Sequence, residues 1–163
     1  MMTHKHPPLK RHESLQPLSR DHYAGLVQAQ HLVRAADAGP VERRAALADF
    51  LEAWRREIEP HFEDEERLLP TLLTDDELAS LHDEHQKLRT LAEQGSQRRR
   101  RVDPGADWCR QLGEALRDHI RWEERTLFAD VQARATDAQL AELTRHTADL
   151  DEQRGRSFDR GET

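Results

Sequence analysis

The stretch HFEDEERLL at residues 61–69 returns as HIRWEERTL at residues 119–127. Both copies read His-x-x-x-Glu-Glu-Arg-x-Leu. In an α-helix, residues i and i+4 lie on the same face, so each copy presents an imidazole and a carboxylate to one point in space. The repeat therefore predicts two helices that face each other across a shared polar site.

A lone histidine precedes each copy, His22 before the first and His85 before the second. A half-unit of one His followed by His-x-x-x-Glu thus occurs twice. Two half-units that face each other offer four imidazoles and two carboxylates, which suits a pair of transition-metal ions. The candidate metal ligands are His22, His61, Glu65, His85, His119 and Glu123.

Composition favours one helical domain. The chain has 163 residues, of which 35% are charged and 5% aromatic, and Ala, Leu, Glu and Arg are abundant. The formal net charge of -7 argues against a general nucleic-acid binder, and the basic run at residues 98–101 is interpreted as a solvated connection between helices.

The number of cysteines and the hydropathy of the chain indicate where in the cell the protein is expected. Cys109 is the only cysteine, so we expect neither an intramolecular disulfide nor a thiolate metal site. No apolar run approaches the ~20 residues that span a bilayer, and the N-terminus lacks the apolar segment of a signal peptide. The sequence predicts a cytoplasmic protein without a membrane segment.

Apolar residues spaced three or four apart predict five helices, at about residues 17–37, 40–72, 74–95, 106–131 and 136–150. Capping patterns begin the third and the fifth, at Thr74 and Thr136. Pro60 should kink the second helix beside His61. Four long helices with short connections predict an all-α, up-down-up-down four-helix bundle with a short extra C-terminal helix.

The predicted domain organisation has four parts. Residues 1–15 form a flexible leader, residues 16–135 the metal-binding bundle, residues 136–150 an accessory helix and residues 151–163 a polar tail.

All six candidate ligands fall on the predicted apolar stripes. A single histidine there is more often a hydrogen-bonded core residue, but two buried carboxylates without a Lys or Arg at the same level cost several kcal/mol. A divalent metal supplies the missing positive charge. Imidazoles and carboxylates without thiolates suit Fe, Mn, Zn or Co, and two ions so held keep open positions for O2, NO, peroxide or hydroxide.

At these residues the sequence resembles the hemerythrin-like family, also called the HHE cation-binding domain, over about residues 17–134. The phrases that carry the resemblance are RDH at 20–22, PHFEDEE at 60–66, DEHQKL at 83–88 and HIRWEE at 119–124. It implies a four-helix bundle around a non-haem di-iron centre bridged by Glu65 and Glu123. It also implies that one iron takes the first two of the four histidines and the other iron the last two.

The cofactor that we expect is two iron ions joined by an oxo or hydroxo bridge, with zinc or manganese as alternatives. Oxygen-carrying members of the family have a second histidine where this chain has Arg89, and an aspartate where it has Glu124. His82 is a candidate fifth nitrogen, and Glu66 and Glu124 are alternatives to the assigned carboxylates.

The predicted function is a metal-binding protein that binds O2, NO or iron for sensing, storage or stress response, and the sequence does not decide whether it is also an enzyme. A di-iron oxidase or peroxidase-type enzyme and a structural zinc bundle are the alternatives. The expected partner is a small ligand such as O2, NO or peroxide, with neither nucleic acid nor membrane, and the chain is expected to be a monomer or a homodimer.

Overall fold

The computed structural model describes residues 10–159, with side chains described as far as Leu150 and for Glu152. Every regular element in that range is helical. The α-helices are α1 (Gln16–Ala36), α2 (Pro40–Ala53), α3 (Glu59–Leu68), α4 (Asp75–Arg98), α5 (Ala106–Trp122), α6 (Phe128–Arg134) and α7 (Asp137–Asp159). Two π-helical turns, η1 (Trp54–Ile58) and η3 (Glu123–Leu127), and a 3-10 turn, η2 (Pro70–Leu72), complete the order.

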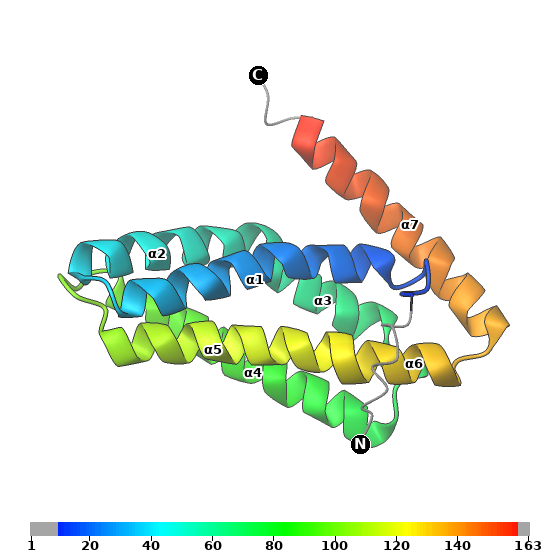
Figure 1. Ribbon diagram of the computed structural model, residues 1–163. Helices are drawn as coiled ribbons and strands as arrows, with labels where there is room; N and C mark the ends of the chain where they lie inside the picture. The colour runs from blue at the N-terminus through cyan, green and yellow to red at the C-terminus, as the bar shows by residue number, and fades with distance from the viewer. Residues whose placement is uncertain (1–9, 160–163) are drawn as a thin grey trace, which may run out of the picture.

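Four rods lie side by side, and α7 begins at one end of them and points obliquely away (Figure 1). The rods are α1, α2 continued by α3, α4, and α5 continued by α6. Helix α1 packs against α5 and α2, and α4 packs against α5, α2 and α3. Short connections between consecutive rods place neighbours antiparallel. The predicted all-α four-helix bundle with an extra C-terminal helix is confirmed, but that helix has 23 residues and is not short.

Helices α4 and α7 begin at the capping motifs that the sequence predicted. The Thr74 hydroxyl accepts a hydrogen bond from the Glu77 backbone N–H, and the Glu77 carboxylate accepts one from the Thr74 N–H, at 3.1 and 2.8 Å. Thr136 and Gln139 make the same reciprocal pair at the start of α7. Both pairs satisfy N–H groups that have no partner within the helix.

Where a kink was predicted, beside Pro60, the hydrogen-bond pattern changes to the π-helical turn η1, which ends just before α3. Pro60 follows this turn within a continuous helix, and the wider π-helical turn accommodates a residue that has no N–H to donate. The second π-helical turn, η3, begins at Glu123 and was not predicted, since no proline or glycine marks it. Single π turns inside α-helices occur frequently at functional sites.

Both ends of the described chain differ from the prediction. The polar tail expected after Leu150 is helical as far as Asp159, and no proline interrupts this stretch. At the other end, residues 10–15 are not a free leader. Leu15 is fully buried and Arg11 bonds to Glu124, which fixes this segment to the bundle. Residues 1–9 lie outside the described part of the chain.

The core consists of two apolar clusters separated by a polar layer. The loop-end cluster includes Ala29, Leu32, Phe50, Trp54, Phe62, Leu88, Cys109, Leu112, Leu116 and Ile120. The α7-end cluster includes Leu15, Leu18, Leu69, Leu81, Leu127, Phe128, Val131, Leu143 and Leu150. Every rod contributes to both clusters, and the polar layer lies where the two clusters approach each other.

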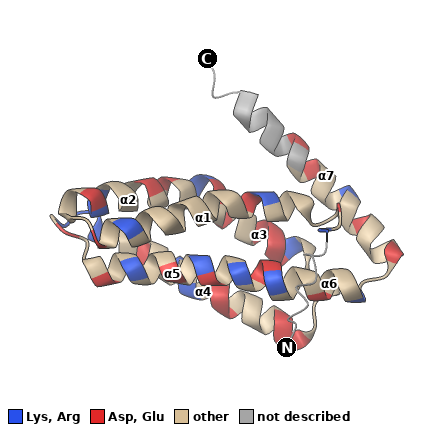
Figure 2. Ribbon diagram, in the orientation of Figure 1, with Lys and Arg blue, Asp and Glu red and all other residues tan. Residues whose placement is uncertain are grey.

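The outer faces of the bundle carry charges of both signs, interspersed along the helices (Figure 2). Within the described residues, no helix combines the length and the apolar character needed to cross a membrane.

Candidate metal centre

The polar layer contains all six residues that the sequence singled out. His22 comes from α1, His61 and Glu65 from α3, His85 from α4, His119 from α5 and Glu123 from η3. All six are buried, and the most exposed, His22, retains only 4% of its accessible surface. The four rods thus bring together residues that are far apart in the sequence.

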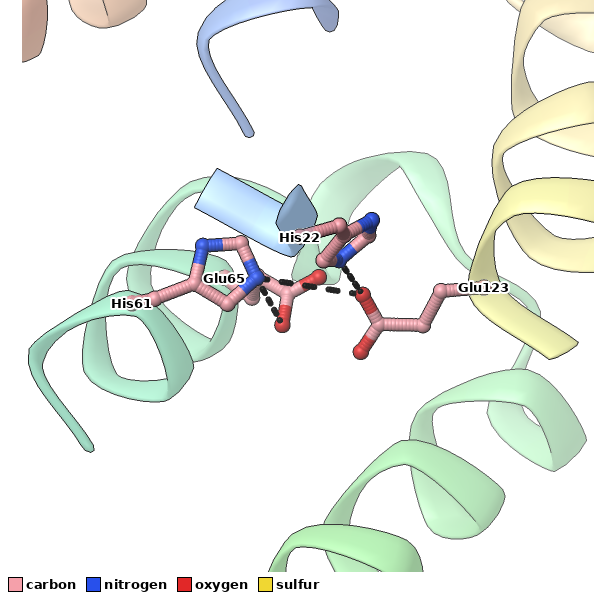
Figure 3. Close-up of side chains that lie close together, drawn as sticks. All are labelled: His22, His61, Glu65 and Glu123. Carbon is pink, nitrogen blue, oxygen red and sulfur yellow. Dashed lines mark hydrogen bonds and ion pairs between the residues drawn. The ribbon is translucent and has the colours of Figure 1, made fainter. Parts of the chain in front are cut away.

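The six residues form two groups that share both carboxylates. One group is His22, His61, Glu65 and Glu123, and the other is Glu65, His85, His119 and Glu123. Within each group, one nitrogen or oxygen atom from every residue lies within 4.8 Å of the others. Figure 3 shows the first group, with both imidazoles and both carboxylates turned toward a common centre.

Glu123 presents one carboxylate oxygen to each group. Its Oε2 lies 2.8 Å from Nε2 of His22 and 3.9 Å from Nε2 of His61. Its Oε1 lies 2.6 Å from Nε2 of His119 and 3.4 Å from Nε2 of His85. This carboxylate therefore lies between the four imidazoles and is in contact with each of them.

Glu65 connects the groups in a different way. A single oxygen, Oε1, lies 3.1 Å from Nε2 of His61 and 3.3 Å from Nε2 of His85. The i,i+4 spacing from the histidine on the same helix places each glutamate in the layer, as the repeated motif predicted.

The donor atoms of the layer converge without forming a satisfied hydrogen-bond network. Nε2 of His61, Nε2 of His119 and both carboxylate oxygens of Glu65 have no hydrogen-bond partner. His119 lies only 2.6 Å from Glu123, but the two atoms are not oriented as donor and acceptor. Buried polar atoms without partners cost free energy, and a cation at their common centre would satisfy all of them. The donor set fits a pair of metal ions.

On their outer side, two of the imidazoles are held by hydrogen bonds to a second set of carboxylates. Nδ1 of His22 lies 2.6 Å from Oε1 of Glu124, and Nδ1 of His61 lies 2.8 Å from Oδ2 of Asp21. A carboxylate at Nδ1 fixes the ring orientation and the tautomer, which leaves Nε2 free to bind a metal.

The other two imidazoles have looser outer partners. Nδ1 of His85 lies 3.4 Å from Glu66, and Nδ1 of His119 lies 3.5 Å from Glu84, and neither contact has hydrogen-bond geometry. The second group is therefore oriented less strictly than the first.

The outer carboxylates connect the helices in a closed ring. Asp21 of α1 contacts His61 of α3. Glu66 of α3 contacts His85 of α4, and Glu84 of α4 contacts His119 of α5. The η3 turn closes the ring by supplying the carboxylate for the histidine of α1. Each outer carboxylate is adjacent in sequence to an inner residue. This adjacency is the one feature of the sequence that could have identified the outer carboxylates.

The structure places the alternative candidates outside the inner layer. Glu66 and Glu124 lie behind the imidazoles instead of between them. His82 is exposed and belongs to neither group. Arg89, which occupies the place of the family's additional histidine, forms two hydrogen bonds to Glu66, at 2.9 and 2.7 Å.

Two phenylalanine rings cover the layer from the apolar clusters. Phe62 stacks on His85, with ring centroids 3.9 Å apart and an interplanar angle of 6°. Phe128 stacks on His22 at 5.5 Å and 18°. These buried rings exclude water from the imidazole faces, which lowers the local dielectric constant and strengthens electrostatic interactions inside the layer.

In the metal-free protein, the buried carboxylates favour protonated imidazoles. Burial lowers the pKa of His22, but hydrogen bonds to Glu123 and Glu124 outweigh it and raise the pKa to about 9. Burial likewise lowers the pKa of His119, and the charge of Glu123 overrides it and raises the pKa to about 10. Burial raises the pKa of Glu123, but the charge of His119 and hydrogen bonds hold that pKa well below its usual range.

The stability of the metal-free protein should therefore fall in alkaline solution. Histidines whose pKa is raised by folding stabilise the fold fully below about pH 6.5, and this contribution disappears as the pH rises through 9 to 10. We expect the unfolding midpoint of chelator-treated protein to decrease steadily from pH 6.5 to pH 10, as measured by circular dichroism. A midpoint that stays constant or rises over this interval would contradict the assigned imidazole–carboxylate contacts.

Comparison with known proteins places this geometry in a family. A family model described as Hemerythrin HHE cation binding domain matches residues 15–131, and a second, overlapping match covers residues 76–156. The first match spans all four rods and all six buried residues. Neither the curated proteins nor the solved structures contain a match to the chain.

Proposed function

The chain belongs to the hemerythrin HHE cation-binding domain family, and on that premise we propose that its polar layer binds two metal ions, with iron as the expected metal. His22 and His61 would hold one ion, and His85 and His119 the other. Glu65 and Glu123 would be shared between the two. The division of the six residues into two groups with both carboxylates in common supports this assignment.

One observation carries the proposal. Four imidazole Nε2 atoms and two carboxylates converge in a fully buried layer, and several of these atoms have no hydrogen-bond partner. Such a layer between two apolar clusters is costly without a cation, and neutral imidazoles and carboxylates are ligands that Fe, Mn, Zn and Co accept.

We propose further that the protein binds a small ligand, O2, NO or peroxide, or stores iron, with a di-iron oxidase or peroxidase-type enzyme as the alternative. A pair of iron ions held by these six residues would supply redox chemistry and binding of a small ligand. The residues of the chain supply the environment: the outer carboxylates orient the imidazoles, and Phe62 and Phe128 keep water from their faces.

The test is an anaerobic ligand titration of iron-loaded, reduced protein, followed by absorption spectroscopy. We expect O2 or NO to produce a new visible band that disappears when the gas is removed, and a His31→Ala control, altered at an exposed histidine outside the layer, to behave identically. Continuous consumption of peroxide in excess would instead establish an enzyme. Tightly bound zinc that iron cannot replace, with no spectral change, would establish a structural site.

A further inference from the structure

Residues 10–15 form a strap that lies against the end of the bundle. Gln132 of α6 fastens it: the His12 backbone N–H donates to Oε1 of Gln132 at 2.9 Å, and Nε2 of Gln132 donates to the Lys10 carbonyl at 2.8 Å. Ser14 and Leu15 are fully buried, and Leu15 belongs to the α7-end cluster. The strap is thus held by both its backbone and its side chains.

Arg11 of the strap reaches the outer carboxylate of His22. Its Nη2 donates to the backbone carbonyl of Glu124 at 2.7 Å and to Oε2 of the same residue at 3.1 Å. The other oxygen of this carboxylate, Oε1, lies 2.6 Å from Nδ1 of His22. Glu124 is therefore held between a guanidinium on one side and an imidazole on the other.

A second path connects the same two residues. The guanidinium of Arg11 lies over the ring of Phe128, 5.7 Å from its centroid. The same ring stacks on His22. Arg11 therefore supports His22 both at its Nδ1 atom, through a carboxylate, and at its ring face, through a phenylalanine.

We propose that Arg11 is a positioning residue for the metal position formed by His22 and His61, so that the strap sets the affinity for one ion of the pair. This inference rests on the proposed binding of two ions. It goes beyond that proposal because it makes one position depend on a segment outside the four rods.

Among residues 10–159, no segment outside the rods plays the part of the strap at the other position. The outer carboxylate of His85 is Glu66, and its guanidinium partner is Arg89 on α4, a helix of the bundle itself. The contact between Glu66 and His85 is also longer, at 3.4 Å. The two positions should therefore respond to different substitutions.

The experiment is a metal titration of the full-length apo-protein with Co(II), an optical probe for this ligand set, in wild type and Arg11→Gln. Loss of the carboxylate that holds a ligating histidine typically lowers metal affinity about 10- to 100-fold. Arg11 acts one contact further out, through Glu124, so we expect a decrease of up to about 10-fold for one of the two ions, with the other unchanged. Arg11→Lys should recover part of the loss, because an ammonium group retains a charge-assisted bond to Glu124.

Combined variants identify the position that is affected. In a His61→Ala background, where the first position is already damaged, Arg11→Gln should change nothing further. In a His119→Ala background, it should weaken the remaining ion. Arg89→Gln serves as the matched control, since it removes the guanidinium behind the other position and should spare the ion at His22 and His61.

Gln132→Ala loosens the strap without altering any residue next to the layer and should weaken the same ion as Arg11→Gln. Equal affinities in wild type and Arg11→Gln would overturn the inference. So would an equal loss at both positions accompanied by a lower melting temperature of the apo-protein, because this is the result of a purely structural role. A wild-type protein that binds no metal at all would instead overturn the proposed function, on which the inference rests.

Discussion

Replacing His61 and His119 together by alanine should reduce the metal content from about two ions per chain to nearly none. Each substitution removes one of the two imidazoles of one group, and each also removes the i,i+4 partner of a shared carboxylate. A position with one imidazole and the shared carboxylates has a single nitrogen donor. Iron and zinc bind more tightly where two nitrogen donors are present. Metal analysis after extensive dialysis measures the loss.

The matched control is His31→Ala combined with His146→Ala. Both of these histidines are exposed, and neither belongs to the two groups. This control should retain the metal content of the wild type. Circular dichroism of the His61/His119 variant should still show a helical protein, because the two apolar clusters are unchanged. An unchanged metal content in that variant would contradict the assignment of the layer as the metal site.

Glu123→Gln should have the second large effect, since this one carboxylate contacts all four imidazoles. The amide retains the shape of the side chain but removes its charge, so both ions should bind far more weakly. In the metal-free protein, the buried protonated imidazoles lose their principal counter-charge. Removal of one partner of a buried ion pair costs about 3–5 kcal/mol, and we expect a decrease of that order in the free energy of unfolding.

Glu65→Gln is the appropriate comparison for this prediction. Its carboxylate contacts two imidazoles through one oxygen, so both the metal loss and the destabilisation should be smaller than for Glu123→Gln. Urea unfolding of the two metal-free variants near pH 6.5, alongside metal analysis of the loaded proteins, provides both quantities. A larger effect of Glu65→Gln than of Glu123→Gln would contradict the claim that Glu123 contributes more than Glu65 to metal binding and stability.

The inner layer was predictable because helical periodicity determines which side chains share a face. His61 with Glu65, and His119 with Glu123, are each separated by four residues on apolar stripes, and His22 and His85 interrupt similar stripes. Buried polar residues at regular positions on four helices have few interpretations besides a common site. For the same reason, the bundle and the capping motifs at Thr74 and Thr136 could be predicted.

The roles of the adjacent carboxylates could not be predicted with the same certainty. Successive residues of a helix differ by about 100° in direction, so the choice between Glu65 and Glu66, or between Glu123 and Glu124, depends on the exact rotation of each helix. That rotation depends on packing and on the π-helical turn at Glu123, which no residue in the sequence marks. The outer contacts join different helices and therefore depend on the tertiary structure.

The strap was missed for a related reason. Residues 10–15 have no periodic apolar pattern, and the sequence signal in this region, a basic and proline-containing leader, is typical of a mobile terminus. Its order comes from specific partners, Gln132 and Glu124, that lie more than a hundred residues away in the chain. Such contacts leave no local signature.

The most direct test of the central claim is metal analysis of the purified protein, paired with an absorption spectrum before and after reduction and re-exposure to air. The proposed centre predicts two irons per chain and a near-ultraviolet to visible band that changes with oxidation state. Zinc alone without such a band, persisting after iron is offered to the apo-protein, would contradict a redox-active pair of irons in the layer of His22, His61, Glu65, His85, His119 and Glu123.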